Sequence, residues 1–91
     1  MTIPKFAARR DKNEAEIINT MELAGASVLS LSSKGVPDLL VYFRGKHYLI
    51  EIKSSKGHLT KDQKVFHGKW KGPIHIVRSI DDALSVLSDS L

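Results

Sequence analysis

Three residues in the middle of the chain have the types and the spacing of a hydrolytic metal site. Asp38 follows a Gly-x-Pro turn, and Glu51 and Lys53 lie two residues apart in an apolar segment further on. Two neighbouring carboxylates repel each other, and a hard divalent cation such as Mg²⁺ or Mn²⁺ relieves that repulsion. Such a cation lowers the pKa of bound water, and a lysine stabilises charge developing on a phosphate. The pattern therefore predicts phosphodiester hydrolysis.

A β-hairpin is the element that must position these three residues. Apolar segments at 39–44 and 46–53 meet tightly at Arg44 and Gly45, which is typical of a hairpin turn. Side chains alternate along a strand, so Glu51 and Lys53 point to the same face. The hairpin also carries Asp38, at the start of its first strand, toward the end of its second. We therefore expect Asp38 beside Glu51.

The remaining segments predict an α/β fold in the order α-β-β-β-α-β-α. Helical periodicity runs from residue 11 or 13 to 24, and Gly25 is placed to end that helix. Residues 27–32 and 74–77 are typical of strands, Thr60 opens a second helix, and Ser79 opens a third. The third strand, second helix and fourth strand form a right-handed β-α-β unit with parallel strands. We expect a mixed four-stranded sheet flanked by helices.

Composition limits the classes of protein to which the chain can belong. Its 91 residues form one domain at 11–91 after a basic N-terminal arm at 1–10, and its net charge of +4 favours a polyanionic partner. It has no cysteine, which excludes disulfide and thiolate zinc sites. It has no apolar run of bilayer length and no signal peptide. These features predict a soluble, cytoplasmic protein without a membrane partner.

Two segments resemble a known nuclease family. Gly35-Val-Pro-Asp38 followed by Glu51-Ile-Lys53 is similar to the PD-(D/E)XK nuclease core, and Lys56-Gly-His-Leu-Thr60 with Gln63 resembles its VRR-NUC branch. The similarity is greatest to the short stand-alone proteins of phages and bacteria, and it covers about residues 10 to 88. It implies a restriction-endonuclease-like fold. It also implies that the protein acts in the cytoplasm of a bacterium or of a phage-infected host.

The resemblance also implies roles for individual residues. Asp38 and Glu51 would be the metal ligands, with the backbone carbonyl of Ile52 as the third, and Lys53 would be the catalytic lysine. Gln63 would reach into the site from the second helix. The family uses a glutamate on the first helix, for which there are two candidates, Glu14 and Glu16. Their spacing to the helix end favours Glu16, while the periodicity leaves both open.

The activity implied by this family is cleavage of DNA by a homodimer. The predicted function is a Mg²⁺- or Mn²⁺-dependent endodeoxyribonuclease that acts on structured or branched DNA, like a Holliday-junction resolvase. Alternatives are a nuclease-fold module that binds such DNA without cutting it, and a restriction-like nuclease on linear duplex. The residues that we expect to contact DNA phosphates are Arg9, Arg10, Lys34, Lys56, Lys61 and Lys64.

Simpler structural explanations compete for several residues. Glu51 and Lys53 could lie on the exposed face of an edge strand, although the order of elements predicts a central strand. A capping box with Thr60 accounts for Gln63 without any catalytic role. On the same helix His67, one turn from Gln63, could face the site or substrate, but we expect it to be exposed. Phe66 and Trp70 could form a base-stacking platform, but we expect them to pack in the core.

Overall fold

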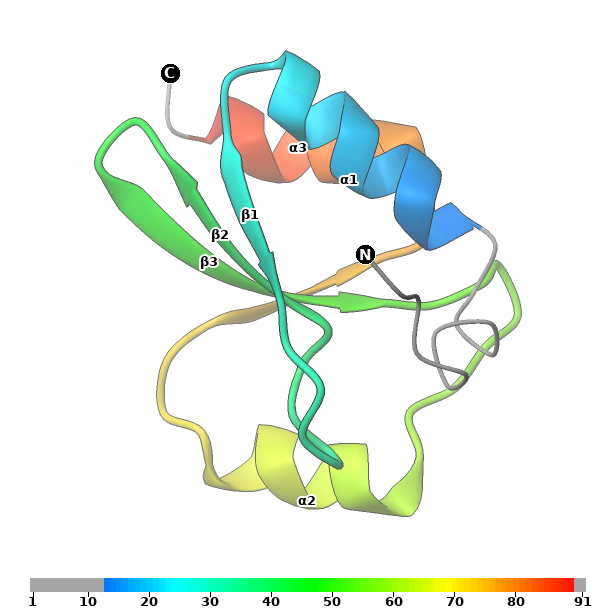
Figure 1. The fold of residues 1–91 in the computed structure, drawn as a ribbon. Coiled ribbons are helices and arrows are strands. Elements are labelled where there is room, and N and C mark those ends of the chain that lie inside the picture. The colour runs from blue at the N-terminus through cyan, green and yellow to red at the C-terminus, as the bar shows by residue number, and fades with distance from the viewer. Residues whose placement is uncertain (1–12, 90–91) are drawn as a thin grey trace.

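Residues 13–89 fold as three helices around a mixed four-stranded sheet, in the order predicted from the sequence (Figure 1). The structure is a computed structural model that describes residues 13–89, so Arg9 and Arg10 of the predicted basic arm lie outside the described residues. The elements are α1 Asn13–Leu23, β1 Ser27–Ser30, β2 Leu39–Phe43, β3 Lys46–Ile52, α2 Lys61–Lys69, β4 Ile74–Val77 and α3 Ile80–Ser88.

The sheet places β3 between two neighbours. Its strand order is β1-β2-β3-β4, with β2 antiparallel to both β1 and β3 and β4 parallel to β3 through the α2 crossover. Leu39 pairs with Ile50 across the predicted hairpin, so the continuing register sets Asp38 opposite Glu51. Since β3 is central, Glu51 does not belong to an exposed edge strand. The strand ends at Ile52, so Lys53 lies one residue beyond it.

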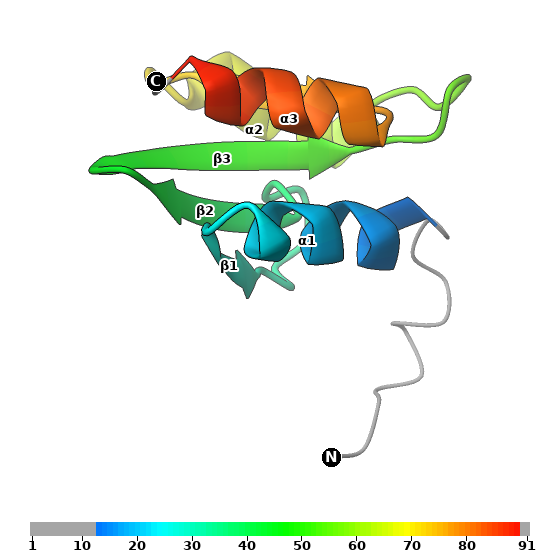
Figure 2. The same ribbon diagram turned by 90° about the horizontal axis from the view of Figure 1, so that it is seen from above.

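One face of the sheet carries the hydrophobic core. Figure 2 shows α1 and α3 side by side over this face. Ile17 and Met21, one helical turn apart on α1, are fully buried against the sheet. The sheet contributes every second residue of its strands to the core, among them the fully buried side chains of Leu39, Val41, Ile50 and Val77. This alternation is the one that the hairpin pattern predicted.

The opposite face of the sheet is largely uncovered. Its side chains include Leu29, Tyr42 and Ile76, which are 58%, 45% and 42% exposed. Helix α2 lies apart from the other two helices, below the sheet in Figure 1 and near the end at which β3 stops. None of the residues of α2 is buried, in contrast to α1 and α3. The two faces of the sheet are therefore packed in different ways.

In the described part of the chain, no helix has the length and apolar character needed to cross a lipid bilayer.

Candidate active site

Asp38 is held at the point where β2 begins. Its Oδ2 atom accepts a hydrogen bond of 2.8 Å from the backbone N–H of Ile52, the last residue of β3. The preceding Pro37 is fully buried, which anchors the turn that delivers the carboxylate. In a strand, the N–H and C=O of one residue point toward the same neighbour. The carbonyl of Ile52 therefore points toward β2, on the side where Asp38 lies just before the first paired residue, Leu39.

The glycine before Asp38 has a specific steric role. Gly35 has a φ of +79°, and a Cβ atom there would lie 2.9 Å from the backbone carbonyl oxygen of Asp62 on α2. Both the backbone conformation and the close approach require glycine. Lys34 and Asp62 add an exposed ion pair of 3.3 Å between the same two segments. The Asp38 turn and α2 are thus packed against each other.

Glu51 is fully buried on the face of β3 that looks toward α2. Its Oε2 atom accepts a 3.1 Å hydrogen bond from Nε2 of Gln63. Gln63 also completes the predicted capping box: its Oε1 accepts from the N–H of Thr60 at 2.8 Å, and its own N–H donates to Oγ1 of Thr60 at 3.2 Å. The two explanations of Gln63 are therefore compatible, because one amide end caps the helix and the other contacts Glu51.

His67 also approaches Glu51, so its predicted exposure is wrong. Its side chain is 18% exposed, and its Nε2 atom lies 3.6 Å from Oε1 of Glu51. His67 is one helical turn beyond Gln63, so both side chains leave α2 on the same face. The sequence places the two at this spacing, but only the docking of α2 shows that their shared face looks toward the sheet.

The two candidate acids of the first helix, Glu14 and Glu16, lie in different environments. Glu16 is exposed, whereas Glu14 is only 7% exposed. Glu14 lies three and seven residues before Ile17 and Met21, so it shares their buried stripe. The start of α1 is held near the end of β3, because Nδ2 of Asn13 donates to the carbonyl of Lys53 at 3.4 Å. The phase of α1 therefore favours Glu14 as the acid nearer to the sheet.

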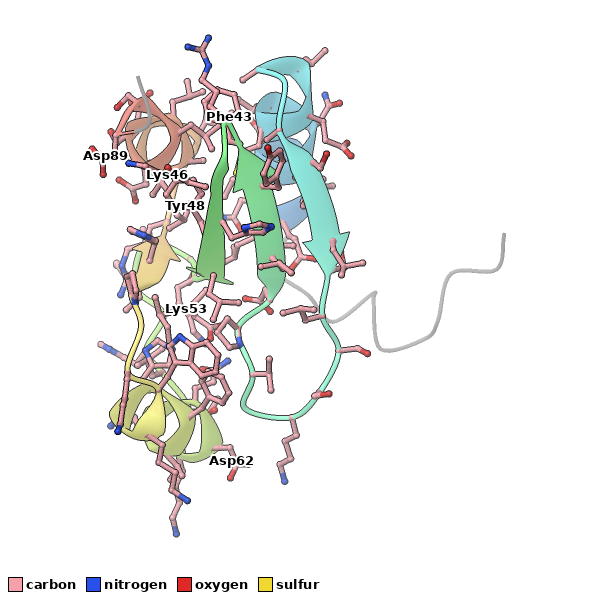
Figure 3. All side chains as sticks on the ribbon, turned by 90° about the vertical axis from the view of Figure 1, so that its left-hand side faces the viewer. Phe43, Lys46, Tyr48, Lys53, Asp62 and Asp89 are labelled. Carbon is pink, nitrogen blue, oxygen red and sulfur yellow. The ribbon has the colours of Figure 1, made fainter. Side chains whose placement is uncertain are left out.

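Lys53 lies where the central strand gives way to a loop. Figure 3 shows it at the end of the sheet nearest α2. Its N–H donates to the carbonyl of Val77 at 3.0 Å, which continues the β3–β4 pairing by one residue, and its side chain is half-buried. This position is compatible with a catalytic lysine beside Glu51, while its side-chain role stays a prediction.

Arg78 holds the loop after Lys53 in place, a role that was not predicted from the sequence. Its Nη1 atom donates to the carbonyls of Ser54 and Gly57 at 2.7 and 2.8 Å. Its own N–H donates to Oδ2 of Asp82 at 2.8 Å. These bonds hold the loop to the end of β4. Ser54 and Gly57 lie more than twenty positions from Arg78 in the sequence, so no local pattern indicated these two contacts.

The predicted phosphate contacts are surface lysines around this end of the sheet. They are exposed residues of the β1–β2 loop, the β3–α2 loop and α2, namely Lys34, Lys56, Lys61 and Lys64. Lys34 is already paired with Asp62, but its side chain is 87% exposed and free to exchange partners. Exposure makes these ammonium groups accessible to a polyanion.

The two aromatic residues of α2, Phe66 and Trp70, are not buried in the hydrophobic core. The rings of Phe66 and Trp70 stack with centroids 5.4 Å apart, yet Trp70 is 47% exposed. Together with Val65 they line an open cavity of about 450 Å³ that also contacts Lys34 and Lys69. The prediction that Trp70 packs in the core is therefore wrong, because α2 docks at the end of the sheet and not over it.

The oxygen donors at this site suit a hard divalent cation. Within residues 13–89, no three His, Cys, Asp or Glu side chains lie in an arrangement that holds a metal ion. A metal here would need a backbone donor, and the carbonyl of Ile52, which follows Glu51 in the chain and faces the Asp38 side of β3, is the candidate. Carboxylate and carbonyl oxygens are the donors that Mg²⁺ and Mn²⁺ prefer, with water completing the shell.

Comparisons with protein-family models, with curated proteins and with solved structures gave no match for this chain. The geometry of Asp38, Glu51, Lys53, Gln63 and the α1 acid is therefore the basis for any functional assignment.

Proposed function

We propose that the protein is a metal-dependent endodeoxyribonuclease with a PD-(D/E)XK core of the VRR-NUC type. The observation that carries the proposal is the complete burial of Glu51 on the central strand, opposite Asp38. Burying a carboxylate costs several kcal/mol in principle, and an apolar residue at this position would avoid that cost. A buried acid next to a second acid and a lysine is better explained by chemistry than by stability.

The residues of the site divide the reaction between them. Asp38 and Glu51, with the carbonyl of Ile52, would hold Mg²⁺ or Mn²⁺. When bound, that ion supplies polarisation of the phosphate and a lowered pKa of water. The ammonium group of Lys53 orients the attacking water and stabilises charge on the phosphate oxygens. Gln63 holds the Glu51 carboxylate in place from α2, and Glu14 replaces Glu16 as the acid supplied by α1.

DNA is the proposed substrate, because the surface near the site is basic. The net charge is +4, and exposed lysines lie on α2 and on the loops beside the two carboxylates. The absence of cysteine suits a reducing compartment such as the cytoplasm of a bacterium or a phage-infected host. Preference for branched DNA follows from the family resemblance.

A homodimer is proposed as the active form, with the uncovered sheet face as the contact surface. This face presents Leu29, Tyr42 and Ile76, and its strand positions carry no exposed Asp, Glu, Lys or Arg. Two copies that each carry a positive charge can meet there without charge repulsion. A twofold arrangement would present two active sites to two strands of a junction.

The test is cleavage of labelled DNA by the purified protein. A four-way junction and a linear duplex of the same arm sequence are incubated with Mg²⁺, Mn²⁺, Ca²⁺ or a chelator. We expect cleavage of the junction with Mg²⁺ or Mn²⁺ only, and its loss in Asp38→Asn and Lys53→Ala. Glu22→Gln, which changes an exposed acid of α1, is the matched control and should cleave like the wild type.

Three other results would contradict the proposal. No cleavage of either substrate, with both variants indistinguishable from the wild type, would remove the nuclease assignment. Tight binding of the junction without metal and without cleavage would favour the non-cleaving binding module. Cleavage of the linear duplex alone, at a defined sequence, would favour the restriction-like nuclease.

A further inference from the structure

Helix α2 brings two polar side chains, Gln63 and His67, to Glu51. The proposed function assigns a role to Gln63 alone. Gln63 contacts Oε2, and His67 lies 3.6 Å from the other oxygen, Oε1. The Nε2 atom of His67 is buried and forms no hydrogen bond in the described part of the chain. An imidazole nitrogen that is removed from water costs free energy unless it gains a hydrogen-bond partner.

The packing of α2 makes this burial unusual. Of the large apolar side chains near His67, Val65 and Trp70 are 50% and 47% exposed, Phe66 is only partly buried, and α2 has no fully buried residue. Helix α2 therefore does not bury His67 as part of a hydrophobic stripe. His67 is turned inward by the same helical face that brings Gln63 to the sheet, and the carboxylate of Glu51 is what that face meets.

Two contacts, one at each oxygen, restrict a carboxylate more than one contact does. The glutamate side chain has three rotatable bonds, and a single hydrogen bond leaves the carboxylate free to pivot about that bond. At 3.6 Å the His67 contact is longer than a hydrogen bond, and it is attractive when Nε2 carries a hydrogen. A small rotation of the ring, with hydrogen on Nε2, would shorten it to a hydrogen bond.

We propose that His67 is a positioning residue of the active site, which acts through Glu51. With Gln63 it holds both oxygens of Glu51 from α2, so that the carboxylate keeps the orientation that a divalent cation requires. The inference rests on the proposed function, since it assigns a second support to the proposed metal ligand. Residues that orient a metal ligand in this way usually change metal affinity about 10- to 100-fold when they are replaced.

The test compares two variants of similar size, His67→Leu and His67→Gln. Leucine fills the space without a hydrogen-bond donor, whereas glutamine places an amide donor close to the position of Nε2. Mn²⁺ affinity is measured by calorimetry and by electron paramagnetic resonance, and cleavage of the four-way junction is measured as kcat and KM. Junction binding in Ca²⁺ reports on DNA contacts alone, and His58→Ala changes an exposed histidine as the control.

A positioning role predicts about a tenfold loss of Mn²⁺ affinity in His67→Leu, together with a lower kcat. His67→Gln should recover most of both, and junction affinity in Ca²⁺ should stay within about twofold of the wild type. If His67→Leu does not fold, as judged by circular dichroism, His67→Ala takes its place in the same comparison.

If His67 only fills space, the presence or absence of a hydrogen-bond donor at this position should not matter, and either of two results would overturn the inference. Retained Mn²⁺ affinity in His67→Leu, or equal losses in the leucine and glutamine variants, would show that the donor is not needed. These results leave the proposed function intact if the wild type still cleaves the junction. A wild-type protein that neither binds Mn²⁺ nor cleaves DNA would overturn the proposed function and this inference together.

Discussion

The two faces of the sheet bury their side chains by different means. On the face under α1 and α3, Val41 and Ile50 are fully buried by apolar packing. On the other face Tyr42 is 45% exposed, while Glu51 is as fully buried as Ile50, its neighbour in the chain. Adjacent residues of β3 therefore belong to two environments. Apolar packing on the covered face stabilises the fold, whereas the burial of Glu51 on the face toward α2 lowers the free energy of unfolding.

This difference separates what holds the fold together from what we propose for function. The covered face is closed by helices whose apolar stripes match the strands. The other face is closed only around Glu51, by Gln63 and His67 from a helix that has no buried residue of its own. Substitutions on the two faces should therefore have separable effects on unfolding and on DNA cleavage.

The largest expected effect is loss of activity on the α2 side of the sheet. Glu51→Gln keeps the shape of the side chain but removes its charge, and should lower the cleavage rate about 10³-fold. Because a buried carboxylate is also removed, the free energy of unfolding should be unchanged or higher. Cleavage assays and urea denaturation measure the two effects. Cleavage by Glu51→Gln at the wild-type rate would contradict the assignment of the active site to the face toward α2.

The matched substitution on the covered face is Ile50→Ala. Its side chain is fully buried beneath α1 and α3, so the loss of packing should lower the free energy of unfolding by about 2–5 kcal/mol. Cleavage per folded molecule should remain within a few-fold of the wild type, because the opposite face keeps its side chains. A selective loss of cleavage without loss of stability would show that the faces are not independent.

A smaller effect on activity is expected from the loop that follows β3. Arg78→Ala removes two hydrogen bonds to the carbonyls of Ser54 and Gly57 and should release this loop. We expect about a tenfold lower kcat, because Lys53 begins that loop and loses its support. Lys71→Ala removes an exposed positive charge elsewhere and is the control. Equal losses in both variants would indicate an effect of net charge alone.

The smallest effect on monomer stability is expected on the uncovered part of the sheet. Tyr42→Glu changes an exposed side chain and should alter the free energy of unfolding by only about 0.5 kcal/mol. If two copies meet on this face, the introduced charges should shift the protein to monomers in sedimentation velocity experiments. A wild-type protein that sediments as a monomer would contradict the proposed dimer surface.

The order of elements was predictable because its signals are local. Gly25 has a φ of +106° after α1, Arg44 and Gly45 form the hairpin turn, and Thr60 caps α2 as its sequence indicates. Alternation along β3 correctly separated Glu51 from Ile50. Each of these predictions depends on residues within a few positions of one another.

The predictions that failed, and the choice between two acids on α1, needed information about docking. Glu14 and Glu16 are both placed at the start of α1, and the phase of the helix against the sheet buries the first and exposes the second. His67 and Trp70 were assigned opposite environments from those that they occupy, because α2 packs against the end of the sheet. Periodicity gives the face of a helix, but it does not say what lies opposite.

The sequence by itself determined the elements, their order, and the strand and loop positions of Asp38, Glu51 and Lys53, since backbone preferences and side-chain alternation act locally. The tertiary structure decided which side chains surround Glu51. Gln63, His67 and Arg78 make their contacts across 12 or more positions of the chain, where only the packing of α2 and β4 against β3 sets the distances. The strand position of the carboxylate follows from a local pattern, whereas its burial and its partners are consequences of the fold.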